Sequence, residues 1–99
     1  MRPEHPPHPE QSQTFGIHGE VGAPIFATWI AHHARRLGLR GAILWHDAGQ
    51  IDLVLTGLPE LLDAMALGCS LGPREVWVER IERAETALQN LNEFASGCD

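Results

Sequence analysis

Lysine is absent from this 99-residue sequence, and all seven of its basic side chains are arginines. Acidic residues outnumber them by 13 to 7, which gives a formal net charge of −6. An acidic surface repels phosphate backbones and anionic lipids. The composition therefore predicts a protein that binds neither nucleic acid nor membranes.

Long apolar runs are also absent, and none approaches the ~20 residues that span a bilayer. Residues 1–13 are polar and contain four prolines, so they do not resemble the apolar segment of a secretory signal. Both observations predict a soluble, cytoplasmic protein. The sequence has only two cysteines, Cys69 and Cys98, without metal-ligand spacing, and we expect both to be reduced thiols.

The proline-rich residues 1–13 are predicted to form a disordered tail, and residues 14–99 a single folded domain. His5 and His8 lie in this tail, where ligands would not be preorganised. We therefore expect no metal site in the tail. For the protein as a whole we expect no cofactor.

The apolar pattern predicts four strands and two helices. An apolar face recurring every three or four residues marks the first helix, and alternation marks the strands. Their ranges, in order, are strand 14–21, helix 24–37, strands 40–45 and 50–56, helix 58–67 and strand 75–84. Gly38 and Gly68 are predicted to end the helices, and Gly49 to take a positive φ in the hairpin.

The last part of the chain departs from the regular pattern in two ways. Ile81 is out of phase with Val76 and Val78, which predicts a bulge or bend in that strand. Residues 85–99 have helical spacing, yet a short final strand fits them as well. The element order is βαββαβ, typical of an α+β ferredoxin-like sandwich with two helices on one face of an antiparallel sheet.

Several stretches of the sequence resemble the acylphosphatase family. The family loop G-x-V-Q-G-V-G-F-R-x-F is matched here to GIHGEVGAPIF, residues 16–26. The family pattern A-x-x-L-G-L-x-G-W-V-x-N is matched to ARRLGLRGAILW, residues 34–45. AGQID (48–52), Gly57 and GPREVWVERI (72–81) supply the remaining landmarks, and no gap is needed from Gly16 to Asp52.

The resemblance implies an acyl phosphate hydrolase, yet the side chains that the family uses are missing here. In the family, backbone N–H groups of the loop and an arginine hold the phosphate, and an asparagine orients the attacking water. Pro24 takes the arginine position and Trp45 the asparagine position in this match. The former phosphate loop consists of Gly19, Glu20, Val21, Gly22 and Ala23, where Glu20 adds a negative charge.

A shift in the match does not restore these groups. No basic residue lies between Arg2 and Arg35, and no asparagine precedes Asn90. The main hypothesis is therefore a pseudoenzyme, a non-catalytic interaction or regulatory domain with no catalytic residues. One alternative is an acylphosphatase that works through substitute residues, with Arg40 or Arg74 reaching the loop.

A second alternative is a small-ligand or metal-binding module. His18 and His46 are predicted to lie near the former loop, where Glu20 and Asp47 supply carboxylates, although no ligand spacing supports a metal. The adjacent His32 and His33 point about 100° apart on a helix and do not share a metal. His33 is expected to border the core and His32 to be solvated.

The three tryptophans fit core packing or scattered exposure, and the functional alternative is an exposed interaction surface. Trp29 is expected on a helix flank, whereas Trp45 and Trp77 lie on strands. Trp77 is predicted to face away from the helices. Exposed tryptophan is enriched at binding hot spots, so a protein partner or a homodimer is the expected form of association.

Overall fold

The computed structural model describes residues 9–94 and contains four strands and two helices. Every expected helix and strand is present. The bounds, in chain order, are β1 (Gln11–Glu20), α1 (Pro24–Arg36), β2 (Arg40–His46), β3 (Gln50–Gly57), α2 (Pro59–Leu71) and β4 (Trp77–Thr86).

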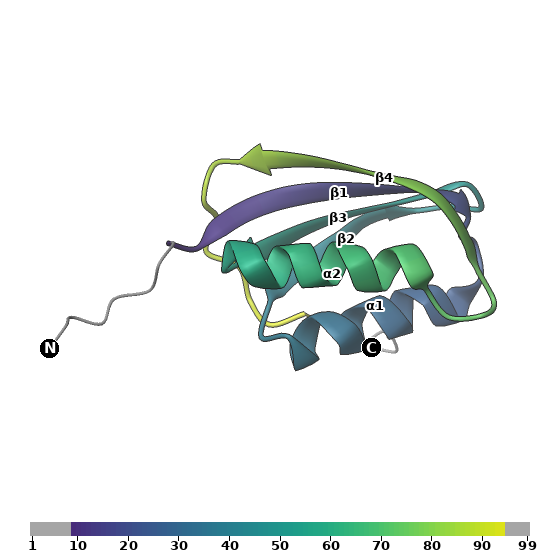
Figure 1. Ribbon diagram of the computed structural model, residues 1–99, viewed down its shortest axis with the longest axis horizontal. Coiled ribbons are helices and arrows are strands. Elements are labelled where there is room, and N and C mark those ends of the chain that lie inside the picture. Colours follow the sequence, from purple (N-terminus) through teal and green to yellow (C-terminus); the bar gives the residue numbers. More distant parts are fainter. Residues whose placement is uncertain (1–8, 95–99) are drawn as a thin grey trace, which may run out of the picture.

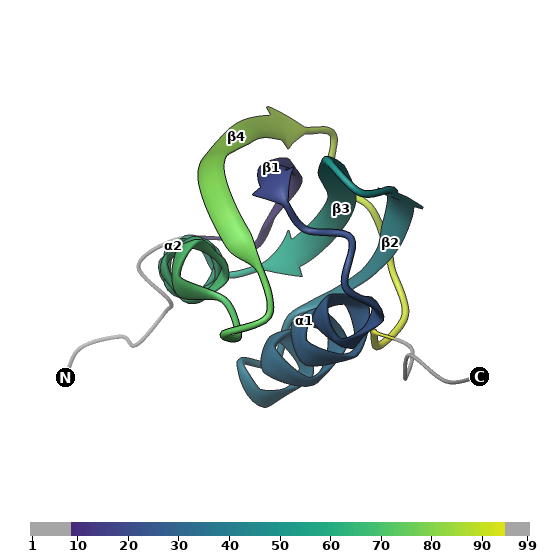
Figure 2. The same cartoon turned by 90° about the vertical axis from the view of Figure 1, so that its right-hand side faces the viewer.

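The four strands form one antiparallel sheet in the order β2-β3-β1-β4. Both helices lie on the same face of this sheet, and the other face is not covered by a helix (Figures 1 and 2). The predicted ferredoxin-like sandwich is therefore confirmed. The first strand occupies the centre of the sheet, so its residues contact both halves of the fold.

The core lies between the sheet and the helices. From α1 it takes Phe26, Ile30 and Ala34, which recur at helical spacing and are fully buried. Gly38, with φ of 75°, lies just after the last turn of this helix. Neither helix, at 13 residues each, is long and apolar enough to cross a membrane, for the part of the chain that the structure describes.

The second helix is longer than predicted, because it continues through Gly68 to Leu71. Gly68 does not end the helix but lets α1 approach. A Cβ at this position would lie 2.2 Å from the His33 Nε2 atom on α1. The helix ends instead at Gly72, whose φ is 59°.

The first strand begins at Gln11, so the predicted tail extends three residues too far into the domain. Ser12 is the reason, because its Oγ lies 2.6 Å from Thr56 Oγ1 in a fully buried pair. The Gln89 backbone N–H also donates to Ser12 Oγ at 2.8 Å. These bonds satisfy polar groups that sequence alone gives no reason to bury. Residues 1–8 lie outside the described part of the chain.

The hairpin between β2 and β3 forms as predicted, but Gly49 does not take a positive φ. Asp47 stabilises the turn instead. Its Oδ1 accepts hydrogen bonds from the backbone N–H groups of Gly49 and Gln50, each at 2.9 Å. This is the local side-chain-to-backbone bonding that favours aspartate in turns.

The last strand contains the predicted irregularity. It runs from Trp77 to Thr86 rather than from Glu75 to Ala84, and the pairing with β1 shifts between His18 and Gly19. This shift inserts one residue between Val78 and Arg80. As a result both Val78 and Ile81 pack against the core, although their spacing breaks the alternation.

The segment after β4 is neither a helix nor a regular strand. Near its end, the Gly41 backbone N–H donates to Asn92 O at 3.1 Å, and Glu93 forms an isolated bridge with Arg40. Phe94 follows and is only 4% exposed, within the core cluster. Of the two alternatives for this segment, the helix is wrong for residues 87–94, and the short strand is reduced to the single bridge at Glu93. Residues 95–99, including Cys98, lie outside the described chain.

Candidate functional site

The loop between β1 and α1 is bound closely to the β2–β3 hairpin. The Gly19 N–H donates to Gly49 O at 3.1 Å, and the Val21 N–H donates to Ala48 O at 3.0 Å. Gly22 is so close that a Cβ there would lie 2.8 Å from Ala48 Cα. Two of the loop's backbone N–H groups are therefore bonded to carbonyl oxygens of the hairpin.

His46 also forms a hydrogen bond with this loop. Its Nε2 lies 2.7 Å from Val21 O. A carbonyl oxygen only accepts hydrogen bonds, so Nε2 carries the proton and donates it. Both backbone polar groups of Val21 are consequently used within the protein.

The start of α1 contributes little to anion binding. Pro24 is the first residue of the helix and has no N–H, and Ala23, at the N-cap, makes no side-chain cap. The Phe26 N–H donates to Ala23 O at 3.0 Å. Pro24 itself is exposed and offers neither charge nor donor.

Trp45 lies on the edge strand β2 and is 57% exposed. Its indole Nε1–H donates to Asp47 Oδ2 at 3.0 Å, so its single donor is occupied. This bond is the largest cause that holds the pKa of Asp47 below its usual value, followed by the Gly49 N–H. The residue at the family's asparagine position thus supports the hairpin.

Neither arginine considered as a substitute contacts the loop. Arg40 begins β2, at the end of the strand away from the loop, and forms an ion pair with Glu10 at 2.5 Å. Arg74 is exposed in the turn before β4. Glu20 is exposed at the end of β1, where it adds negative charge beside the loop.

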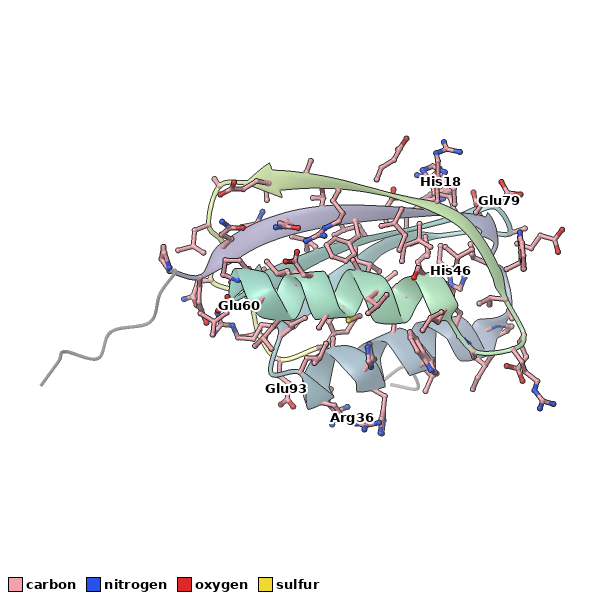
Figure 3. The ribbon with its side chains drawn as sticks, viewed as in Figure 1. His18, Arg36, His46, Glu60, Glu79 and Glu93 are labelled. Carbon is pink, nitrogen blue, oxygen red and sulfur yellow. The ribbon has the colours of Figure 1, made fainter. Side chains whose placement is uncertain are left out.

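The two histidines predicted near the loop lie on different sides of the sheet. Figure 3 shows His18 above the sheet, away from the helices, and His46 on the helix side. His18 Nε2 lies 3.2 Å from Glu82 Oε1, whereas His46 is bonded to the loop. Among residues 9–94, no group of three or more His, Cys, Asp or Glu side chains is arranged to hold a metal.

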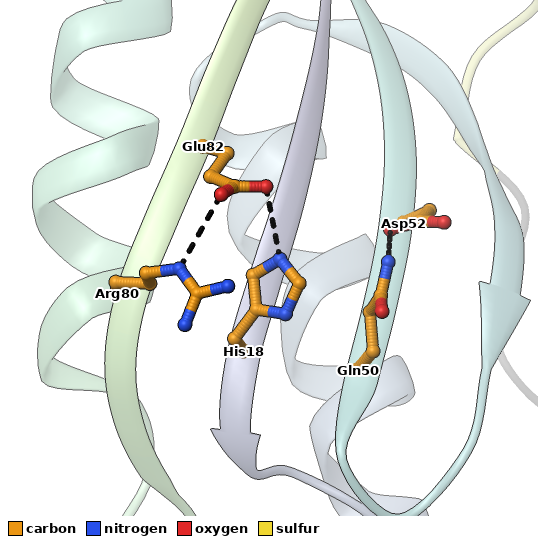
Figure 4. A network of polar contacts seen from close by, with 5 residues as sticks. All are labelled: His18, Gln50, Asp52, Arg80 and Glu82. Carbon is orange, nitrogen blue, oxygen red and sulfur yellow. Dashed lines mark hydrogen bonds and ion pairs between the residues drawn. The ribbon is translucent and has the colours of Figure 1, made fainter.

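The open face of the sheet carries a polar cluster that sequence reasoning missed. His18 contacts Glu82, which also accepts from Arg80 Nε at 3.4 Å, and Gln50 Nε2 donates to Asp52 Oδ1 at 2.8 Å (Figure 4). Arg80 and Glu82 on β4, and Gln50 and Asp52 on β3, lie two positions apart along their strands. That spacing was a usable signal, but the register joining the three strands was not known.

The two histidines of α1, the tryptophans and Cys69 were also singled out in the sequence. His33 is half-buried and stacks on Trp29, with ring centroids 4.9 Å apart, and His32 is exposed. Trp77 is 66% exposed on β4, the opposite edge strand from Trp45, so the two tryptophans lie on different edges of the sheet. Cys69 is a free, buried thiol, and burial raises its pKa to about 12.

The fold and the position of the loop define a class: a small α+β sandwich with a short glycine-containing loop between its first strand and first helix. The family model described as Acylphosphatase matches residues 13–96. An acylphosphatase of Azorhizobium caulinodans is 37% identical over 68 residues, which cover 69% of this chain and 73% of that protein. The chain belongs to the acylphosphatase family.

Further comparisons agree. An acylphosphatase of Aliivibrio fischeri is 27% identical over 85 residues, covering 86% of this chain and 94% of that protein. The solved structure of an acylphosphatase from Coxiella burnetii superimposes with a TM-score of 0.80 at 20% identity, over 86% of this chain and 90% of that one. At that identity the structural likeness concerns the fold.

Proposed function

We propose that this chain is a non-catalytic, cytoplasmic member of its family, acting as an interaction or regulatory domain. The proposal rests on the backbone hydrogen bonds of the loop between β1 and α1. Its Gly19 and Val21 N–H groups donate to hairpin carbonyls, and Pro24 has none to offer. An acyl phosphate would meet carbonyl oxygens and a carboxylate where donors are needed.

The arginine position lacks a cation in either register of the family loop. The family loop also fits three residues later, on GEVGAPIFATW, residues 19–29. The φ of 148° at Gly19 supports this later register, because it puts the motif's first glycine where the backbone favours one. Ala27 then takes the arginine position. In either register the position holds no cation.

The missing groups matter because phosphoryl chemistry depends on positioning and electrostatics. A guanidinium binds phosphate through a planar fork of donors, and removal of such contacts raises the barrier by several kcal/mol. A tryptophan in place of asparagine removes the acceptor that orients water. Together these changes support the absence of acylphosphatase activity.

Hydrolysis of benzoyl phosphate tests the proposal. We expect the rate with the purified chain to equal the spontaneous rate at every substrate concentration, while the Azorhizobium caulinodans relative serves as the positive control. Saturable hydrolysis by the chain would contradict the proposal. In that case Glu20→Gln and His46→Gln would show which substitute residue acts at the loop.

The interaction role is supported by exposed apolar side chains on the edge strand β2. Leu44 is 59% and Trp45 is 57% exposed. Large exposed side chains of this kind mark contact surfaces more often than catalytic ones. Sedimentation velocity over a wide concentration range tests for a homodimer: we expect association that Leu44→Lys weakens, and a monomer at all concentrations would direct attention to a different protein partner.

A further inference from the structure

Two stripes of side chains lie on the outer side of the helix layer formed by α1 and α2, away from the sheet. On α1 the stripe follows the spacing i, i+4, i+7, i+11 and consists of Ile25, Trp29, His32 and Arg36. On α2 the same spacing selects Glu60, Ala64, Leu67 and Leu71. None of these residues belongs to the buried face of its helix. Residues at this spacing share one face of a helix, so each stripe is a continuous strip of surface.

The large apolar side chains of the two stripes lie at the same end of the helix layer. The helices lie side by side and run in opposite directions, so the start of α1 is next to the end of α2 (Figures 1 and 2). Ile25 is 47%, Leu67 66% and Leu71 76% exposed. Trp29 is partly buried and borders a hollow of about 200 Å³ on α1. Exposed apolar side chains gathered in this way are typical of a protein–protein contact.

The other end of the helix layer carries charges of opposite sign on the two helices. Arg36 ends α1 and Glu60 lies in the first turn of α2, and Figure 3 shows both at this end. Both side chains are exposed. No acidic residue occurs in α1, and no basic residue occurs in α2. Between two copies of the chain, α1 is therefore attracted to α2, whereas each helix is repelled by its own counterpart.

The two stripes match each other when they are aligned antiparallel. The facing pairs are then Ile25 with Leu71, Trp29 with Leu67, His32 with Ala64 and Arg36 with Glu60. Apolar side chains face apolar ones, and the guanidinium faces the carboxylate. A parallel alignment would instead place Arg36 against Leu71, so the sequence favours the antiparallel one. Within one chain the helices meet through their flanks, where His33 lies against Gly68, and the stripes do not face each other.

We propose that the helix layer binds a second copy of this chain, with α1 of each copy lying antiparallel on α2 of the other. A single two-fold axis parallel to the helices creates both contacts, because α1 and α2 are already antiparallel within each copy. The four helices then form one apolar cluster at one end and two ion pairs, Arg36 with Glu60 of the other copy, at the other end. This surface is separate from the edge strand β2, and the proposal does not depend on the lack of acylphosphatase activity.

Sedimentation velocity of the full-length Leu44→Lys chain, from micromolar to millimolar concentration, tests the proposal without association through β2. We expect this chain to remain a reversible dimer. Leu67→Glu, added to it, places a carboxylate against Trp29 of the other copy and is expected to weaken dimerisation at least tenfold. Leu88→Glu is the matched control, because Leu88 is equally exposed, at 65%, but lies after β4. We expect it to leave dimerisation unchanged.

Exchange of the two charges tests the pairing itself. In the Leu44→Lys chain, Arg36→Glu and Glu60→Arg each turn two attractive pairs into repulsive ones, and each is expected to weaken dimerisation about tenfold or more. An equimolar mixture of the two variants restores opposite charges at both places, so we expect it to dimerise as the parent does. Misfolded variants would not recover association on mixing. Arg80→Glu and Glu85→Arg carry the same net charges with the changes on β4, and we expect no gain when these two are mixed.

Three results would overturn the proposal. The first is a Leu44→Lys chain that stays monomeric at all concentrations. The second is a dimer that Leu67→Glu and Leu88→Glu affect equally. The third is a mixture of Arg36→Glu and Glu60→Arg that associates no better than either variant alone. All three concern the helix layer only, because association through β2 is tested separately with the unsubstituted chain.

Discussion

Two parts of the chain, one within β1 and one at its end and in the loop that follows, differ in how they use glycine. Around Gly19 and Gly22, the missing side chains let the backbone pack directly on neighbouring strands and the hairpin. Around Gly16, the missing side chain leaves a hollow beside polar groups. The backbone at the loop thus packs on its neighbours, while an unrelated surface of the same strand stays open.

The proposed function implies that the family's fold persists here without its phosphate site. Backbone N–H groups at the end of a strand bind an anion only while they lack other acceptors. Here the hairpin carbonyls of Ala48 and Gly49 are those acceptors. Predictions for the two regions accordingly diverge, and each can be tested by filling a glycine.

Gly19→Ala has the largest expected effect. Its φ of 148° disfavours a side chain, and the Cβ would lie 2.1 Å from Trp77 O. We expect a loss of about 3 kcal/mol in the free energy of unfolding, from backbone strain and displacement of β4. Urea unfolding followed by tryptophan fluorescence measures it. A loss below about 1 kcal/mol would mean that the loop end of the sheet is far more adaptable than described.

His33, at the interface between the two helices, is expected to make the free energy of unfolding depend on pH. Burial lowers the pKa of His33 from 6.5, and Arg36 lowers it further. The Nε2 atom is buried without a partner, against Gly68. The unfolded chain therefore takes up a proton at higher pH than the folded chain, and the free energy of unfolding falls as the pH drops below about 6.5.

Replacement of the histidine isolates this effect from the sheet. His33→Gln is expected to remove part of the loss on acidification, measured as the urea midpoint between about pH 7 and about pH 5. His32→Gln changes the exposed neighbour on the same helix and is expected to retain that part. Equal profiles for the two variants would place the acid sensitivity elsewhere, for instance on the carboxylates of the open face.

Gly16→Ala has the smallest expected effect and the opposite sign to Gly19→Ala. The Cβ meets only ordinary contacts, and alanine restricts the unfolded chain more than glycine does. We expect a gain of roughly 0.5–1 kcal/mol in the free energy of unfolding. A clear loss, measured by the same urea titration, would show that the fold itself requires this glycine.

The fold could be predicted from the sequence because its signals are local. The apolar face of Phe26, Ile30 and Ala34 and the alternation around Ile51 and Leu53 each indicate an element without knowledge of the rest. Errors arose where tertiary contacts decide. Gly68 continues a helix because α1 packs on it, and the strand starts early because Ser12 finds Thr56.

The candidate sites were harder to predict because they depend on strand register. The lack of a basic residue within the loop was readable directly, since none lies between Arg2 and Arg35. The hydrogen bond of Val21 to the hairpin could not be read from the sequence, because its partner Ala48 is distant along the chain. The cluster around Gly16 joins β1, β3 and β4, and only the pairing of these strands brings it together.

The occupancy of the loop can be measured directly by titration with inorganic phosphate. The account predicts that the backbone amide signals of Gly19, Val21 and Phe26 do not shift in a saturable way, because their N–H groups already donate to protein carbonyls. Saturable shifts of these amides at submillimolar phosphate would contradict it, since they would show that the loop releases the hairpin to bind an anion.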